Sequence, residues 1–458
     1  MKGSSSVRRL RLAYIGGGSR GWAHALMNDL ALCPDLTGEV VLYDLNKPMA
    51  QLNARWGKRV NESPQAKGKW KYSVANTLAE ALKGADFVLA SIQPGPIEMM
   101  GSDLEIPKKY GILHPVGDSI GPAGLVRSLR AASDYAEIAR AIEKHCPEAW
   151  VLNFTNPMTV CTRTLHKVFP GIKAFGNCHE VFGTQHRLAE LAKEYLGLKI
   201  TRDDVRINVK GVNHFTWIDR ATYGDVDLIR LYERKMKEPG EVRVIGKEEA
   251  EKLNIFGHCK QVGYDLFRRF GIIAAAGERH LVEFVPWYLK DEATLHRWGV
   301  KLTPYSYRKE RYYSSPDTFK KRLADKKPFE LYGSGEEMVR QMKALLGMGD
   351  IRTNVNLPNV GQIEGLPRDA VVETNAFIGP NSVVPEFSGR LPMGVEALVT
   401  RVVQNQEMIV EAALRKDKTL AFQAILNDSL TNLPTDRAWR MFGEMLRATK
   451  AKLPGWKL

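Results

Sequence analysis

Two short segments of the chain carry side chains that can bind a divalent cation. Residues 176–183 contain the adjacent pair Cys178 and His179, and residues 211–214 end in His214. Thiolate and imidazole are both ligands of divalent transition metals, so two turns that the fold brings together can hold one cation between them. The competing interpretation is structural, because an unpaired cysteine is often a small apolar residue of the core.

A glycine-rich turn near the start of the chain indicates a dinucleotide site. An apolar run stops at Gly16, and Gly18 and Gly21 complete the spacing G-x-G-x-x-G, with Ser19 inside it. Glycine allows a tight bend at such a turn, lets the backbone approach a pyrophosphate, and lets the next helix pack closely. The context supports this reading, because a strand-like segment precedes the turn and an amphipathic segment follows it.

An acidic residue stands where a ribose would need one. The next predicted strand, residues 39–44, ends in Asp44, which lies 23 residues beyond Gly21. A carboxylate at this position binds ribose hydroxyls and repels a 2′-phosphate, so it favours NAD over NADP. Arg20 and Lys47 lie close enough in sequence to weaken that preference. The alternative is an ordinary glycine-rich turn with an aspartate that caps a helix.

The elements that must position these groups alternate along the first half of the chain. Apolar runs of strand length lie at residues 85–92, 149–154 and 171–176, and amphipathic helical segments separate them. This pattern predicts an α/β fold with a Rossmann-type parallel sheet, whose working residues lie beyond the carboxyl ends of its strands. Asn156 follows one such end, and Asp118 opens a small-residue segment before a long helix, where a plain helix cap is equally plausible. We expect an NAD-binding domain over residues 1–200.

The second half, residues 201–458, has a different pattern. Residues 205–211 alternate with period two, as a half-solvated antiparallel strand does. Residues 278–284 place titratable groups, including Arg279 and His280, among apolar ones. Such clustering is typical of sites with perturbed pKa values, although structural ion pairs give the same pattern. We expect an α+β domain that contributes to the substrate site and to oligomerisation.

Composition and charge narrow the classes of function. Charged residues make up 26% of the chain and no apolar run approaches the roughly 20 residues of a membrane helix. The net charge of +14 favours an anionic partner, but no nucleic-acid-binding pattern accompanies it, so a small acidic molecule is the better expectation. Five cysteines without CxxC spacing argue against disulfides and structural zinc. We expect residues 1–9 to be a frayed tail and the protein to be cytoplasmic.

Six motifs, in order along nearly the whole chain, resemble those of the family 4 glycoside hydrolases. They are residues 16–19, 121–130, 155–157, 178–179, 211–214 and 354–361. Each alone is weak, whereas six in the right order are specific. Within the family, Cys178 to Gly183 resembles the α-galacturonidase branch, and the context of Glu180 distinguishes it from α-galactosidases and α-glucuronidases, which also carry Cys-His.

The resemblance implies a glycosidase that uses NAD and Mn2+ instead of the two carboxylates of most glycosidases. Hydride passes from C3 of the sugar to NAD+, a base removes the acidified C2 proton, and the leaving group departs from C1. Water then adds and the hydride returns, while the metal polarises the C2 and C3 oxygens. The resemblance also implies a sheet like those of lactate and malate dehydrogenases, and a dimer or tetramer.

Several site residues follow from the same resemblance. Cys178 and His214 match the metal ligands, with manganese inferred although zinc would bind the pair more tightly. His179 is a candidate general acid, Asn156 a substrate contact, and Asp118 an acidic residue near the reacting sugar.

The base that removes the C2 proton does not transfer from the family. Tyr264 is available, but the surroundings of His280 favour that histidine. We expect Arg279 to bind the substrate carboxylate and Glu180 to contact the substrate. Three alternatives stay open: a family 4 α-galactosidase or α-glucuronidase, an ordinary NAD-dependent hydroxy-acid dehydrogenase, and a non-catalytic NAD-binding protein.

Overall fold

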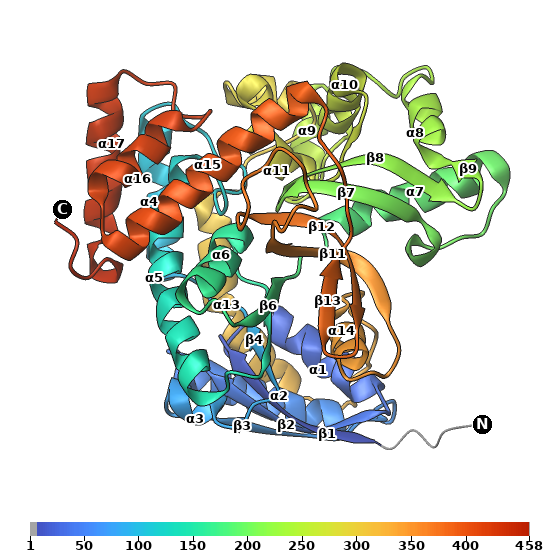
Figure 1. The fold of residues 1–458 in the computed structure, drawn as a ribbon, viewed down its shortest axis with the longest axis vertical. Coiled ribbons are helices and arrows are strands. Elements are labelled where there is room, and N and C mark those ends of the chain that lie inside the picture. The colour runs from blue at the N-terminus through green and yellow to red at the C-terminus, as the bar shows by residue number, and fades with distance from the viewer. Residues whose placement is uncertain (1–6, 458) are drawn as a thin grey trace.

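The structure, a computed structural model, describes residues 7–457, so most of the tail expected at residues 1–9 lies outside the described residues. Figure 1 shows the first strands and helices, in blue, at the lower end of the molecule, and the last helices, in red, at the upper left. All five cysteines are free, and Cys33, Cys146 and Cys161 are buried, as expected of small apolar residues. None of the helices in residues 7–457 combines the length and the apolar character that crossing a membrane requires.

Six parallel strands from the first half form most of one sheet. They are β1 (Arg8–Ile15), β2 (Leu36–Tyr43), β3 (Trp70–Val74), β4 (Phe87–Ala90), β5 (Trp150–Asn153) and β6 (Lys173–Gly176). Their order across the sheet is β3-β2-β1-β4-β5-β6, so the strand order reverses between β1 and β4. This is the order of a Rossmann sheet, which confirms the predicted α/β class.

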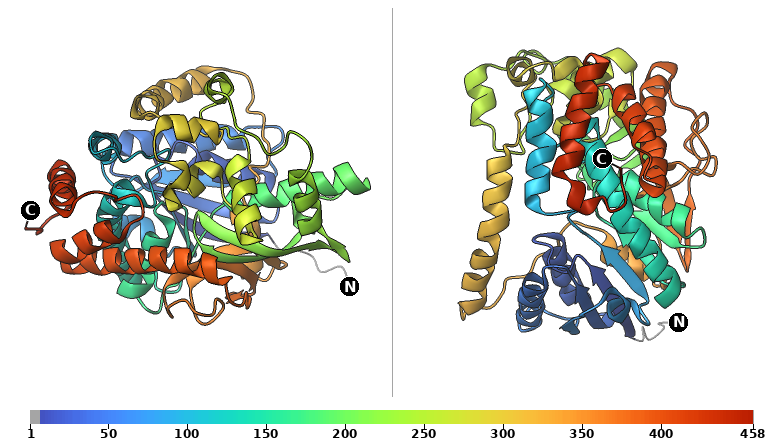
Figure 2. Two further views of the ribbon diagram at one scale, coloured as in Figure 1. Left: turned by 90° about the horizontal axis from the view of Figure 1, so that it is seen from above. Right: turned by 90° about the vertical axis from the view of Figure 1, so that its left-hand side faces the viewer.

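Helices cover both faces of this sheet, as two further views show (Figure 2). They are α1 (Trp22–Leu32), α2 (Lys47–Asn61), α3 (Leu78–Leu82), α5 (Gly121–His145) and α6 (Met158–Val168). Of the other first-half helices, α4 (Ile97–Lys109) packs against α5, and α7 (Glu180–Leu196) packs against the antiparallel sheet of the second half. Successive side chains of a strand point to opposite faces. Leu12 and Tyr14 of β1 therefore pack with Leu26 of α1, whereas Ala13 packs with Tyr135 of α5.

Three antiparallel strands from the second half extend the same sheet beyond β6. They are β11 (Ile351–Pro358), β12 (Val371–Gly379) and β13 (Ser382–Pro385). Asn356 of β11 pairs with Gly176 of β6. The first sheet therefore has nine strands and draws on both sides of residue 200.

A second, antiparallel sheet lies over the carboxyl edge of the first. It contains β7 (Arg206–Val212), β8 (Phe215–Tyr223), β9 (Val226–Asp227) and β10 (Ile273–Ala274). β7 pairs antiparallel with β8, which confirms the prediction from the period-two pattern of residues 205–211. The two-residue turn between β7 and β8 is Asn213-His214.

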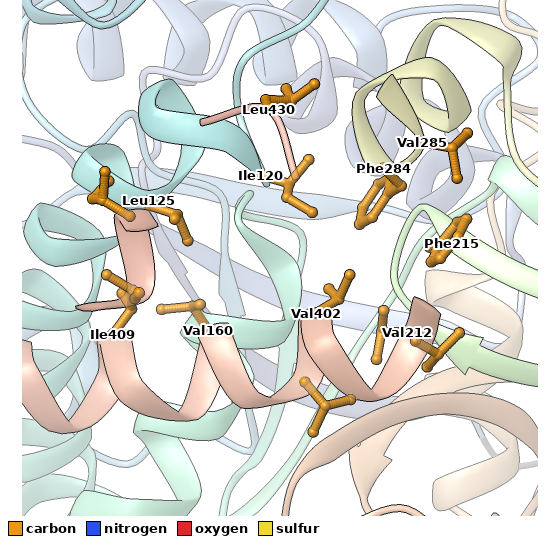
Figure 3. Packing of buried hydrophobic residues seen from close by; sticks show 14 of the residues in the cluster. Ile120, Leu125, Val160, Val212, Phe215, Phe284, Val285, Val402, Ile409 and Leu430 are labelled. Atoms are coloured by element: carbon orange, nitrogen blue, oxygen red, sulfur yellow. The ribbon is translucent and has the colours of Figure 1, made fainter. Parts of the chain in front are cut away.

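The remaining helices of the described residues come from the second half of the chain. They are α8 (Leu228–Met236), α9 (Lys247–Lys252), α10 (Gln261–Phe270), α11 (Glu278–Phe284), α12 (Glu292–Arg297), α13 (Tyr305–Ala324), α14 (Met338–Leu345), α15 (Met393–Arg415), α16 (Lys418–Asn427) and α17 (Thr435–Ala448). Figure 3 shows how Val402 and Ile409 of α15 face Leu125 and Val160 of the first half and Val212 of β7. One apolar core thus joins the two halves.

Candidate active site

Gly16 and Gly18 shape the turn that follows β1. Gly16 has a φ of 85°, and a Cβ there would lie 2.0 Å from the carbonyl oxygen of Ser91, so no larger residue fits without moving the chain after β4. The N–H of Gly18 donates to Oδ2 of Asp44 at 2.8 Å. The N–H of Ser19 closes the turn by donating to the carbonyl of Gly16 at 2.9 Å. The turn is therefore fixed between the ends of β2 and β4.

Asp44 and Gly21 face the part of this turn that stays open. Oδ1 of Asp44 accepts the N–H of Asn46 at 2.7 Å, so this carboxylate also holds the chain before α2. Burial raises the pKa of Asp44, against the hydrogen bonds from Asn46 and Gly18. A Cβ on Gly21, just before α1, would meet no described atom within 4 Å. The amino end of α1 thus presents bare backbone, which suits a pyrophosphate.

Three of the predicted site residues meet in one group. Asp118, His214 and His280 offer ligand atoms that all lie within 4.8 Å of one another. The rings of His214 and His280 are stacked with their centroids 3.7 Å apart. Oγ of Ser119 donates to Asp118 at 2.9 Å and lies 3.2 Å from Nδ1 of His214. The loop before α5, the β7–β8 turn and α11 therefore converge on one point.

The charges in this group favour ligation of a cation. Burial raises the pKa of Asp118, but its electrostatic interactions with His280, His214, Arg127 and Arg308 outweigh burial and lower the pKa to about 2. Burial, followed by the neighbouring His280, lowers the pKa of His214 to about 3. The carboxylate is thus ionised and the imidazole neutral, which are the forms that bind a metal. His214 also has a φ of 66°, a conformation that a non-glycine residue adopts mainly where the surroundings impose it.

Asn156 and Arg127 form the wall beside Asp118. Nδ2 of Asn156 donates to Oδ2 of Asp118 at 3.3 Å, and Nε of Arg127 donates to the carbonyl of Asn156 at 3.2 Å. Three buried atoms here find no hydrogen-bond partner in residues 7–457: Oδ1 of Asn156, Nη1 of Arg127 and Nδ1 of His280. Because buried polar atoms are usually paired, these three indicate the place of a ligand or of ordered water.

Cys178 lies at the end of β6 beside the same turn. Burial raises the pKa of its thiol, and the carboxylates of Glu373 and Glu180 act in the same direction. Asn213, the residue before His214, acts in the opposite direction and lowers the pKa of the thiol. Cys178 and the turn that carries His214 are therefore neighbours, and a bound cation is the factor that would convert this thiol to thiolate.

His179 and Glu180 lie at the edge of the site. Nδ1 of His179 is 2.9 Å from Oε1 of Glu336, and 49% of the His179 side chain is exposed. The hydrogen bond with Glu336 raises the pKa of His179, which favours its protonated form. Oε2 of Glu180 accepts the N–H of Gly277 at 2.5 Å, and Oε1 lies 3.7 Å from Nε2 of His280. Glu180 thus joins α7 to α11.

Arg279 holds the loop that precedes Asp118. Its Nη2 donates to the carbonyl of Pro115 at 3.0 Å and to Oγ1 of Thr303. Glu283, one turn later on α11, accepts through Oε1 the N–H groups of residues 116 and 117, at 2.7 and 2.8 Å. Nε of Arg279 is buried without a partner in the described part of the chain. A substrate carboxylate would therefore bind those N–H groups of the Arg279 guanidinium that are not bonded to the loop, such as Nε.

A cavity of about 600 Å³ opens next to His179 and Glu180. It lies between α7 and the starts of α10 and α11, with Arg187 and Lys260 among its polar walls. This volume is within the range of small-molecule sites. Glu180 lies between this cavity and the group of Asp118, His214 and His280, because it lines the cavity and its Oε1 is 3.7 Å from His280.

The site includes residues that the sequence did not single out. They are Ser119, Arg127, Arg308, Glu336 and Glu373. A charged residue inside an apolar strand, as Glu373 is in Val371 to Asn375, was the one local signal available. The others become visible only when distant segments are packed together.

The chain matches two family models. The description "Family 4 glycosyl hydrolase" covers residues 11–194, and "Family 4 glycosyl hydrolase C-terminal domain" covers residues 209–431. A relative named alpha-galacturonidase from Thermoanaerobacterium saccharolyticum is 49% identical over 456 residues, 99% of this chain and 98% of its own length.

Solved structures agree with these matches. The crystal structure of LplD from Bacillus subtilis, described as a glucosidase, is 46% identical with a TM-score of 0.90, and the match covers 96% of this chain and all of that one. A 6-phospho-alpha-glucosidase from gut microorganisms, in complex with NAD and Mn2+, shares the fold at 19% identity with a TM-score of 0.81 over 98% of this chain and 100% of its own. The family expected from the six motifs is thereby confirmed. The chain belongs to the family 4 glycosyl hydrolases and is a glycosidase.

Proposed function

We propose that the protein hydrolyses α-galacturonides by transient, NAD-dependent oxidation of the sugar. The observation that carries the proposal is the convergence of Asp118, His214 and His280 near Cys178, whose neighbour His179 has its ring 5.6 Å from that of Trp22, just after the glycine-rich turn. The 49% identity over the full length to an alpha-galacturonidase supports the choice of sugar.

The residues fit both expected cofactors. The bare backbone at Gly21 and the carboxylate of Asp44 suit NAD, to be held by Gly16, Gly18, Ser19, Gly21 and Asp44. Cys178 and His214 would hold a divalent cation, and Asp118 and His280 offer further ligand atoms within 4.8 Å of that of His214. The distant relative with NAD and Mn2+ supports manganese, whereas the thiol alone would favour a softer metal. When bound, NAD+ accepts and returns the C3 hydride and the cation acts as Lewis acid at the C2 and C3 oxygens.

The chain's own residues would bind the sugar and move its protons. His280, with its unpartnered Nδ1 and with Nε2 3.7 Å from Glu180, is our candidate for the base at C2. His179, whose protonated form Glu336 favours, is the candidate acid for the leaving group. Oδ1 of Asn156 can accept from a sugar hydroxyl. Asp118 would keep the amide of Asn156 turned for that contact.

The substrate carboxylate needs a cation of its own. We propose Arg279 for this role, because its guanidinium lies near the group and its Nε has no partner within the described chain. Glu180 would contact the sugar on the side of the cavity that it borders.

Hydrolysis of p-nitrophenyl α-galacturonide tests the proposal. The protein, freed of nucleotide and metal, is assayed with NAD+, Mn2+ and a thiol reductant added singly and together. We expect release of nitrophenol only with all three and no net NADH. Activity that survives removal of NAD+ and metal would contradict the mechanism.

The alternatives separate in the same assay. A preference for p-nitrophenyl α-galactoside or α-glucuronide would change the sugar and argue against the role of Arg279. Stoichiometric NADH with a hydroxy acid would indicate a dehydrogenase, which the family matches already disfavour. A non-catalytic NAD-binding protein would bind the nucleotide and release no nitrophenol. The cytoplasmic location and the dimer or tetramer stay predictions.

A further inference from the structure

Glu373 is a buried carboxylate that no part of the proposed reaction uses. It lies in the middle of β12 and is 1% exposed, inside an otherwise apolar or neutral strand. Burying a carboxylate is costly unless hydrogen bonds compensate for the lost water. Both of its oxygens have such partners: Oε1 accepts from Nδ2 of Asn354 at 2.6 Å, and Oε2 accepts from Nδ2 of Asn213 at 3.1 Å.

Each of these asparagines continues to one of the two expected metal ligands. Nδ2 of Asn354 also donates to the carbonyl of Cys178 at 3.2 Å. Asn213 directly precedes His214 and forms with it the tight turn between β7 and β8, in which His214 has a φ of 66°. One carboxylate therefore ties the peptide of Cys178 and the turn of His214 to the same strand.

We propose that Glu373 is a positioning residue that holds Cys178 and His214 at the separation a divalent cation needs, acting through Asn213 and Asn354. The inference rests on the proposed role of these two ligands. Outer partners of metal ligands fix ligand orientation, and their loss typically lowers metal affinity 10–100-fold.

A carboxylate suits this place better than any neutral group. Asn213 and Asn354 both present N–H donors, and the two oxygens of the Glu373 carboxyl group accept one from each. A glutamine would turn its own NH2 group toward one of them.

Cobalt provides a readout that does not depend on turnover. Metal-free protein is titrated with Co2+ alone, and the thiolate-to-cobalt charge-transfer band reports the participation of Cys178. We expect Glu373→Gln to weaken Co2+ binding by about 10–100-fold, with NAD affinity, measured by nucleotide fluorescence, unchanged. Asn354→Ser should weaken Co2+ binding to a similar extent. The double variant should lose less Co2+ binding free energy than the sum of the two single losses, because both substitutions break the contact between Glu373 and Asn354.

Asp265→Asn is the matched control. Asp265 is a carboxylate of comparable burial, 2% exposed, bonded to Arg268, Arg269 and Tyr288, and it has no part in the site. This variant should lose thermal stability and keep the wild-type Co2+ affinity and charge-transfer band.

The outcomes separate the two levels of the proposal. The positioning role would be overturned if Glu373→Gln kept the wild-type Co2+ affinity, or if Asp265→Asn weakened Co2+ binding equally. It would also be overturned if the effects of Glu373→Gln and Asn354→Ser were additive, or if the wild type showed no charge-transfer band. A strong band in the wild type that Glu373→Gln weakens, without any galacturonidase activity, would refute the proposed function and leave the positioning role standing.

Discussion

Glu283 offers a test of how the loop of Asp118 is held. Its side chain is 1% exposed, and Oε1 accepts the N–H groups of Val116 and Gly117 at 2.7 and 2.8 Å. Burial raises the pKa of Glu283 to about 8; the charge of Asp118 adds to this, while the two N–H groups and Arg308 oppose it. Near neutral pH the folded protein therefore keeps a proton on this carboxyl group.

The sign of the pH effect follows from comparing the two states. An unfolded glutamate releases its proton at its ordinary pKa of 4.5, whereas the folded protein keeps it up to about 8. Between these values the unfolded state binds fewer protons, so the free energy of unfolding falls as the pH rises. The difference of pKa from 4.5 to about 8 sets an upper limit of about 5 kcal/mol on that loss.

Two substitutions at this position separate charge from hydrogen bonding. Glu283→Gln keeps an acceptor oxygen and cannot ionise, so it should match the wild type near about pH 5 and exceed its stability by a few kcal/mol near about pH 8. Glu283→Ala leaves two buried N–H groups unpaired, at about 1–3 kcal/mol each, and frees the loop of Asp118. It should therefore be less stable at both pH values and turn over more slowly.

Urea denaturation of the three proteins across this pH range, followed by circular dichroism, measures these differences. Parallel stability curves for the wild type and Glu283→Gln would refute the raised pKa. A cost below about 1 kcal/mol for Glu283→Ala would refute the clamp on the loop.

Three further predictions concern other positions. Gly16→Ala should lower thermal stability, because its Cβ would lie 2.0 Å from the carbonyl oxygen of Ser91. Gly21→Ala should keep the free energy of unfolding within about 1 kcal/mol of the wild type and weaken NAD binding in titration, because a Cβ there meets no described atom. Cys178→Ser should lower Mn2+ affinity and glycosidase activity by more than about 100-fold, with NAD binding retained in the same titration. Burial raises the pKa of Asp428 to about 6. In denaturation experiments the free energy of unfolding of the wild type should therefore fall by up to about 3 kcal/mol between about pH 4 and 6, and Asp428→Asn should not show this fall.

Local patterns predicted the parts of the fold that depend on neighbouring residues. The spacing of Gly16 and Gly18 before a helix, and the alternation of short apolar runs with amphipathic segments, led to the Rossmann sheet that the strand order confirms. The period-two pattern of residues 205–211 likewise predicted β7. Each of these signals is contained within a dozen residues or two, so no knowledge of packing was needed.

The missing parts depend on pairings between distant segments. Residues 354–361 form one of the six family motifs, but their local pattern does not indicate that β11 pairs with β6 at the edge of the parallel strands. Clustered titratable residues marked His280 as a site residue, and the structure brings it to Asp118 and His214. The loop contacts of Arg279 and Glu283 could not be predicted, because their partners at residues 115–117 lie more than 160 positions away.

Strand register explains how two halves of the chain contribute to the proposed metal site. Asn356 of β11 lies opposite Gly176 of β6, and antiparallel counting from that pair places Asn354 opposite Cys178, where it contacts the Cys178 carbonyl. β12 in turn places Glu373 opposite Asn356 and reaches β7 through the Asn375 side chain, which accepts the N–H of Val209. A slip of one residue would turn these side chains to the other face of the sheet. The register of β11 and β12 therefore sets the relation between Cys178, from the first half, and the turn of His214, from the second.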